Sequence, residues 1–174
     1  MYLISAYFDD NSARLLQGFI DEIYAVTGND FMIRNQVPPH LTLCAFEQRS
    51  DDAAKSLFAE MKEVLSFGEI EIASIGAFLP YVLFAQAVAN EYLFNSNDSI
   101  VQVLGKNEDT IINRFYKPYA WIPHITLGKT LKEEQMQKAF DVLQKNFTPF
   151  KAEIKSFGLA KPNPHKNLEM FYKF

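Results

Sequence analysis

The phrase Pro-His-apolar-Thr-Leu occurs twice in this chain, once at Pro39–Leu43 and again at Pro123–Leu127. These two copies hold two of the three histidines in the sequence. Successive side chains of a β-strand point to opposite faces. Each copy would therefore present an imidazole and a hydroxyl on one face and bury aliphatic side chains on the other. Any fold of this chain must accommodate two short strands of the same kind.

The two copies lie at equivalent places in two halves with the same order of elements: strand, helix, loop, motif strand, helix, strand. In the first half, hydrophobic patterning predicts strands at 2–8, 40–46 and 69–79, and helices that end near Gly28 and Leu65. In the second half it predicts strands at 81–89, 124–129, 150–160 and 168–174, a helix at 91–104, and a helix from a Thr130–Glu133 capping box to Phe147.

This repeated order predicts an α+β fold in one domain, residues 1–174, made of two similar lobes at about 1–79 and 80–174. If a pseudo-twofold axis relates the lobes, His40 and His124 should face each other. The chain has 174 residues, 48% of them hydrophobic, which is enough to bury a substantial core.

Charge and cysteine content limit the partners and the compartment. The formal net charge of -4 argues against a protein that coats duplex nucleic acid, but a few donors can still bind one phosphate. A single cysteine, Cys44, excludes an intrachain disulfide and favours the cytoplasm. The N-terminal segment is not typical of a signal peptide, and no apolar run reaches the roughly 18 residues of a membrane helix. We expect a cytoplasmic monomer without a membrane partner.

Two imidazoles with two hydroxyls suit the cleavage of a phosphodiester. One neutral histidine, His40 or His124, can take a proton from water while the other, protonated, donates a proton to the leaving oxygen. Thr42 and Thr126 can donate hydrogen bonds to the phosphate oxygens. A 2′,3′-cyclic phosphate fits well, because its ring is strained and its leaving group is tethered. The sequence leaves open which histidine is the acid and which is the base.

Three other interpretations remain open. A lone His-x-Thr is usually a structural strand with one hydrogen-bonded histidine, although two matching copies argue against this. A zinc site would need a third ligand, and neither motif strand carries Asp or Glu on its histidine face; we expect no metal and no cofactor. A module that binds a nucleotide or an RNA end without turnover is the main alternative to an enzyme.

The segments "PPHLTLCAF" and "PHITLGK" resemble the paired motifs of the 2H phosphoesterase superfamily, which includes the bacterial 2′-5′ RNA ligases and cyclic phosphodiesterases. The segment "GAFLPYVLFAQAV" is similar to the one that joins the two lobes in that family. The resemblance implies two antiparallel sheets that line a central cleft, with helices outside. It also implies metal-independent chemistry on cyclic nucleotides or RNA ends, including reverse 2′-5′ ligation, with His40, Thr42, His124 and Thr126 as the catalytic residues.

Further residues are candidates for substrate binding. Many family members carry an arginine soon after the second motif, where this chain has Lys129. Strand alternation would turn Lys129 toward the core unless the strand bulges at Gly128. In the loop before the second motif, cations alternate with aromatic residues, which suits a nucleotide; the candidates there are Arg114, Tyr116 and Tyr119. Cys44 is expected to be a buried, inert thiol, and His165 is expected to be exposed and without a role.

Overall fold

The computed structural model describes residues 1–172. Its strands are β1 (Tyr2–Phe8), β2 (Leu41–Glu47), β3 (Glu69–Phe78), β4 (Val82–Ala87), β5 (Ile111–Ile112), β6 (His124–Gly128), β7 (Phe150–Pro162) and β8 (His165–Tyr172). Its α-helices are α1 (Asp10–Thr27), α2 (Phe31–Arg34), α3 (Asp51–Glu60), α4 (Glu91–Gly105) and α5 (Glu133–Asn146), and two 3-10 turns are η1 (Met61–Glu63) and η2 (Arg114–Tyr116). This mixture of helices and antiparallel strands confirms the predicted α+β class.

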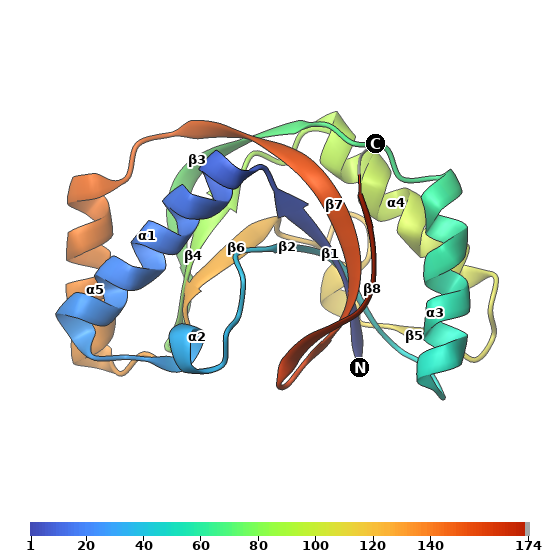
Figure 1. Ribbon diagram of the computed structural model, residues 1–174, viewed down its shortest axis with the longest axis horizontal. Helices are drawn as coiled ribbons and strands as arrows, with labels where there is room; N and C mark the ends of the chain where they lie inside the picture. The colour runs from blue at the N-terminus through green and yellow to red at the C-terminus, as the bar shows by residue number, and fades with distance from the viewer. Residues whose placement is uncertain (173–174) are drawn as a thin grey trace.

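The strands form one hydrogen-bonded sheet in the order β1-β2-β6-β4-β3-β7-β8, and β5 pairs with β2. All pairings are antiparallel, and an additional β1–β7 pairing closes a ring of strands. The two sheets expected from the resemblance are therefore joined. The cause is the long strand β7, which pairs with β3 through Phe150–Glu153 and then continues along β1 and β8. Figure 1 shows β7 arching from one side of the molecule to the other.

The helices cover two sides of this curved sheet. Helices α1 and α5 pack together on one side, where the rings of Phe19 and Phe147 lie 5.6 Å apart, and α3 and α4 lie on the opposite side (Figure 1). Each packed group thus combines elements from both halves of the sequence. The division into lobes at 1–79 and 80–174 stays a prediction. No helix within residues 1–172 is long and apolar enough to span a bilayer.

Capping residues set where helices α1 and α5 begin and where α1 ends. Asp9 caps α1 by accepting from the backbone N–H groups of Asn11 and Ser12, both at 3.0 Å, and Gly28 ends the helix at a positive φ of 67°. The predicted capping box at Thr130 was wrong. Thr130 has a positive φ of 58°, and α5 begins later, where the side chain of Gln135 accepts from the N–H of Lys132 at 2.9 Å. This turn directly follows the second motif.

Candidate active site

The two motifs meet at the centre of the sheet. Strands β2 and β6 are paired through Leu41 and Ile125, both fully buried. In an antiparallel pair, the same register places His40 opposite Thr126 and Thr42 opposite His124. These four side chains leave the sheet on the face opposite Leu41 and Ile125. The expected face-to-face arrangement of the two motifs follows from this single strand pairing.

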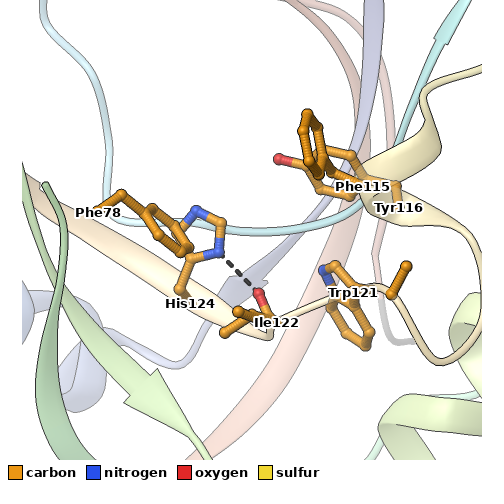
Figure 2. Close-up of a pocket in the computed structure, with 7 residues that line it drawn as sticks. Phe78, Phe115, Tyr116, Trp121, Ile122 and His124 are labelled. Carbon is orange, nitrogen blue, oxygen red and sulfur yellow. Dashed lines mark hydrogen bonds between the residues drawn. The ribbon is translucent and has the colours of Figure 1, made fainter.

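Both motif histidines are held in the same way. The Nδ1 of His40 lies 2.7 Å from the carbonyl oxygen of Pro38, and the Nδ1 of His124 lies 2.8 Å from the carbonyl oxygen of Ile122 (Figure 2). A carbonyl only accepts hydrogen bonds, so each Nδ1 carries the proton and donates it. In the neutral rings, each Nε2 is then left with a lone pair that can take up a proton.

The histidines lie in one cleft with a volume of about 270 Å³. Of the residues proposed from the sequence, those that line it are His40, Thr42, His124, Thr126, Tyr116 and Lys129. Arg114 and Tyr119 do not line it. The guanidinium of Arg114 lies 4.7 Å from the centre of the Phe115 ring, and Tyr119 is 95% exposed. Substrate contacts by these two residues stay predictions.

Lys129 reaches the cleft because β6 is irregular. In the pairing of β6 with β4, Thr126 lies opposite Phe84 and Gly128 lies opposite Leu83, so the register shifts by one residue between them. Such a bulge changes the face to which the next side chain points. The Nζ of Lys129 lies 5.4 Å from the centre of the Phe31 ring, at the edge of the cleft. The sequence analysis expected Lys129 to face the core unless the strand bulges at Gly128. The structure has this bulge, and Lys129 lines the cleft.

An aromatic pocket of about 490 Å³ adjoins the cleft and shares Phe78, Tyr116 and His124 with it. Figure 2 shows His124 and Phe78 on one side of this pocket and Phe115, Tyr116 and Trp121 on the other. Trp121 is buried and donates from Nε1 to the carbonyl oxygen of Thr42 at 3.0 Å. Phe115 is 62% exposed, so its ring is available to a bound molecule.

His165 is a cleft residue that the sequence analysis missed. The sequence predicts an exposed side chain, but His165 is half-buried at the start of β8 and lines the cleft. Its ring centre lies 4.7 Å from that of His40. The turn between β7 and β8 is tighter than predicted, since β7 runs to Pro162 and β8 begins at His165 (Figure 1 shows this hairpin). His165 lacks the motif, and strand alternation does not reveal where a hairpin folds.

Burial controls the protonation of these rings. The pKa of His40 is lowered from 6.5 to about 4, mainly by burial; the hydrogen bond to the Pro38 carbonyl opposes this shift, and the basic groups His165, His124 and Lys129 add to it. Burial also lowers the pKa of His124 and of His165. Both motif histidines are therefore mainly neutral at pH 7 in the free protein. A bound phosphate anion would favour the charged form of one of them.

The buried thiol of Cys44 matches its expected inert character, because burial raises its pKa to about 12. Across residues 1–172, no group of three or more His, Cys, Asp or Glu side chains is arranged to hold a metal ion. The donor set of the cleft consists of imidazoles, hydroxyls and one ammonium group. Such groups can hold a phosphate and move protons.

The low pKa of His40 predicts a pH-dependent stability. The unfolded chain binds more protons at this residue between pH 6.5 and about 4, so the stabilisation present above pH 6.5 is lost as pH falls through this window. From pH 7 to pH 5, wild type should lose about 1–2 kcal/mol more unfolding free energy than His40→Gln. Urea denaturation of both proteins at both pH values checks this. Equal losses would show that His40 has an ordinary pKa in the folded state.

The family model of the 2′-5′ RNA ligase superfamily matches residues 13–165. The solved structure of TT0787 from Thermus thermophilus has a TM-score of 0.61 and 17% identity, with 98% of this chain and 96% of that chain covered. That of E. coli LigT complexed with 3′-AMP has a TM-score of 0.57 and 11% identity, with the same coverages of 98% and 96%. A comparison with curated proteins gave no match.

At these identities the two structures establish a shared fold. An antiparallel α+β fold with two His-x-Thr strands meeting at one cleft defines the class of 2H phosphoesterases, and the family match agrees with it. The chain belongs to the 2′-5′ RNA ligase superfamily.

Proposed function

We propose that the protein is a metal-independent phosphodiesterase that hydrolyses 2′,3′-cyclic phosphates, or related cyclic phosphodiesters, on nucleotides or RNA ends. The observation that carries this proposal is the equivalent anchoring of two imidazoles at one cleft, through Nδ1 bonds of 2.7 Å at His40 and 2.8 Å at His124. Two titratable groups with free Nε2 atoms are what a proton transfer at each end of a phosphodiester requires.

Hydrolysis in this site needs one proton transfer at each histidine. One Nε2 takes a proton from water while the water oxygen forms a bond to phosphorus. The bond from phosphorus to a ribose oxygen breaks, and that oxygen receives the Nε2 proton of the other histidine. The product is a phosphomonoester with a free ribose hydroxyl. Reverse 2′-5′ ligation would use the same groups, with a ribose hydroxyl in place of water.

The remaining polar groups of the cleft would hold the phosphate. Thr42 and Thr126 can donate to the non-bridging oxygens, and the ammonium of Lys129 can balance their charge. Tyr116 lies against Thr42, and burial raises its pKa, so it would bind as a neutral phenol. Because these groups would surround only one phosphate, and because the net charge is -4, a mononucleotide or an RNA terminus suits the site better than a long duplex.

The aromatic pocket would take the base. Its apolar walls and the residue His124, which it shares with the cleft, would put a flat ring system next to the reacting phosphate. Stacking on exposed aromatic rings tolerates every base. The structure of E. coli LigT with 3′-AMP supports a nucleotide as the bound class. A cytoplasmic monomer fits this proposal, with a nucleotide or RNA terminus as its partner.

Phe115 offers a test of the base pocket. Phe115→Ala should raise KM for a cyclic mononucleotide roughly tenfold, the loss expected for one stacking contact, and change kcat by less than about twofold. Ile111→Ala is the matched control, since Ile111 is similarly exposed at 69% but lies outside the pocket. Steady-state kinetics on both variants would decide. An unchanged KM in Phe115→Ala would place the base elsewhere.

The direct test of the function is turnover of the four 2′,3′-cyclic mononucleotides, with separation of the 2′- and 3′-monophosphate products by chromatography. The proposal expects one regioisomer to dominate, because the cleft holds the ribose in one orientation. Titration calorimetry with the same compounds distinguishes the alternative. Tight binding with no product would support a non-catalytic nucleotide-binding module and contradict the enzyme.

A further inference from the structure

The first motif strand accepts hydrogen bonds from side chains that lie outside the sheet. Strand β2 pairs with β6 near the start of the motif and with β5 near its own end. Between these pairings, the carbonyl oxygen of Thr42 accepts from Nε1 of Trp121 at 3.0 Å. The carbonyl oxygen of Leu43, the last residue of the motif, accepts from Nδ2 of Asn97 at 2.8 Å. Side chains thus take the place of a neighbouring strand at the end of the motif.

Asn97 lies on α4, is 1% exposed and contacts two segments at once. Its Nδ2 also donates to the carbonyl oxygen of Tyr116 at 2.9 Å. Carbonyl oxygens only accept, so both N–H bonds of the amide are used, one for β2 and one for Tyr116. Its Oδ1 is buried and has no hydrogen-bond partner among residues 1–172, which is unfavourable for stability. The side chain therefore bridges two segments while its own carbonyl stays unsatisfied.

Tyr116 occupies the junction of the two cavities. Its side chain lines both the cleft and the aromatic pocket, and its phenol contacts Thr42. Figure 2 shows Tyr116 and Trp121 on one side of the pocket and His124 on the other. His124 belongs to β6, whereas Tyr116 and Trp121 are tied to β2. The distance between the two walls of the pocket therefore depends on how the segment 113–121 is held to β2.

Hydrogen bonds rather than packing hold this segment. At its start, the backbone N–H of Asn113 donates to the carbonyl oxygen of Ala45 on β2 at 2.8 Å. In its middle, the side chains of Phe115 and Tyr119 are 62% and 95% exposed, so burial contributes little to their placement. The bond from Asn97 acts between these two points, at the residue that lines both cavities.

We propose that Asn97 is a positioning residue for substrate binding: by joining Tyr116 to the first motif strand, it sets the width of the aromatic pocket for a nucleobase. This inference rests on the proposed function, in which that pocket takes the base. A base is flat, and a gap of roughly 0.5–1 Å forfeits a quarter to half of the dispersion attraction to a wall. The proton transfers at His40 and His124 need no group from Asn97. Its loss should weaken nucleotide binding and leave the chemical step nearly unchanged.

The first test measures binding without turnover. Trp121 is the single tryptophan of the chain and lies in the pocket wall, so its fluorescence reports the binding of adenosine 3′-monophosphate. Asn97→Leu, which removes both donors from a side chain of similar size, should weaken this binding roughly tenfold. Phosphorus-31 NMR titration with inorganic phosphate, which would occupy the cleft alone, should show a much smaller loss. Unchanged nucleotide affinity, or an equal loss for phosphate, would overturn the proposal.

Two variants on the same helix serve as controls. Asn95→Leu makes the same change at an exposed position, and Ser96→Ala removes a buried hydroxyl that donates within α4. Both should bind the nucleotide as wild type does. If Asn97→Leu does not fold, Asn97→Ser replaces it, because its short side chain cannot reach both carbonyl oxygens. In either variant, amide hydrogen exchange of residues 113–121 should become faster while that of α1 is unchanged; unchanged exchange of this segment would also overturn the proposal.

Steady-state kinetics give a readout that a general loss of structure would not produce. On a 2′,3′-cyclic mononucleotide, Asn97→Leu should raise KM roughly tenfold and change kcat by less than about threefold. A fall in kcat with an unchanged KM would contradict the positioning role. If wild type binds the nucleotide without turning it over, the proposed enzymatic function fails, and the fluorescence and exchange experiments still decide the role of Asn97.

Discussion

Alanine at His40 or at His124 should lower kcat for a 2′,3′-cyclic mononucleotide by roughly a thousandfold or more. Each imidazole supplies one of the two proton transfers, and a positioned acid or base contributes about 10²–10⁴ in rate. KM should change little, because the hydroxyls and Lys129 would still hold the phosphate. Initial rates at saturating substrate, followed by product chromatography, measure this effect.

The controls for this experiment separate chemistry from folding. Amide NMR spectra of both variants should remain dispersed, since each ring is only half-buried. Thr130→Ala is a suitable control near the second motif, because Thr130 is exposed and its hydroxyl donates to the neighbouring carbonyl oxygen of Lys129. Its turnover should match wild type. Full turnover by either histidine variant would contradict the paired-histidine account.

Leu41→Ala should cost about 2–5 kcal/mol of unfolding free energy. Leu41 is fully buried and forms the residue pair with Ile125 that joins β2 to β6. Removing its side chain leaves a cavity under the strand pair that brings the motifs together. Urea denaturation gives the free energy, and a fall in activity at temperatures well below the transition would show that the two strands have also shifted.

The matched control for that cavity is Leu15→Ala. Leu15 is 42% exposed on α1, and its truncation should cost less than about 1 kcal/mol. Leu41→Met, which nearly conserves volume, should cost less than about 1.5 kcal/mol. If Leu41→Ala were no more destabilised than Leu15→Ala, the packing under the β2–β6 pair would not be what holds the two motifs together.

The core of the site could be predicted because its signals are local. Alternation along two short strands is enough to put His40 with Thr42 and His124 with Thr126, and a repeated motif predicts that they meet. The direction of the Lys129 side chain also depends on the bulge at Gly128. The sequence could suggest this bulge but could not establish it. The alternation is set within a few residues along the chain, whereas the meeting of the motifs and the bulge depend on pairing between strands that are distant in the sequence.

The features that were missed depend on contacts between distant segments. Hydrophobic periodicity predicts which side chains of β7 are buried, but it does not predict that β7 pairs with β3 at one end and with β1 at the other. The joined sheet was therefore not predicted. His165 reaches His40 only because the β7–β8 hairpin folds back and Tyr7 holds it, a contact across 158 residues. Arg114 and Tyr119 sit in a loop whose sequence suits a nucleotide; neither lines the cleft, and their contact with a substrate stays a prediction.

Hydrolysis of a 2′,3′-cyclic mononucleotide in the presence of EDTA, by wild type and by the His40→Ala/His124→Ala double variant, tests the central claim most directly. The account predicts turnover by wild type that EDTA does not reduce, and loss of that turnover in a double variant that remains folded. Wild-type turnover that disappears with EDTA, or that persists in the double variant, would contradict metal-free catalysis by the paired histidines.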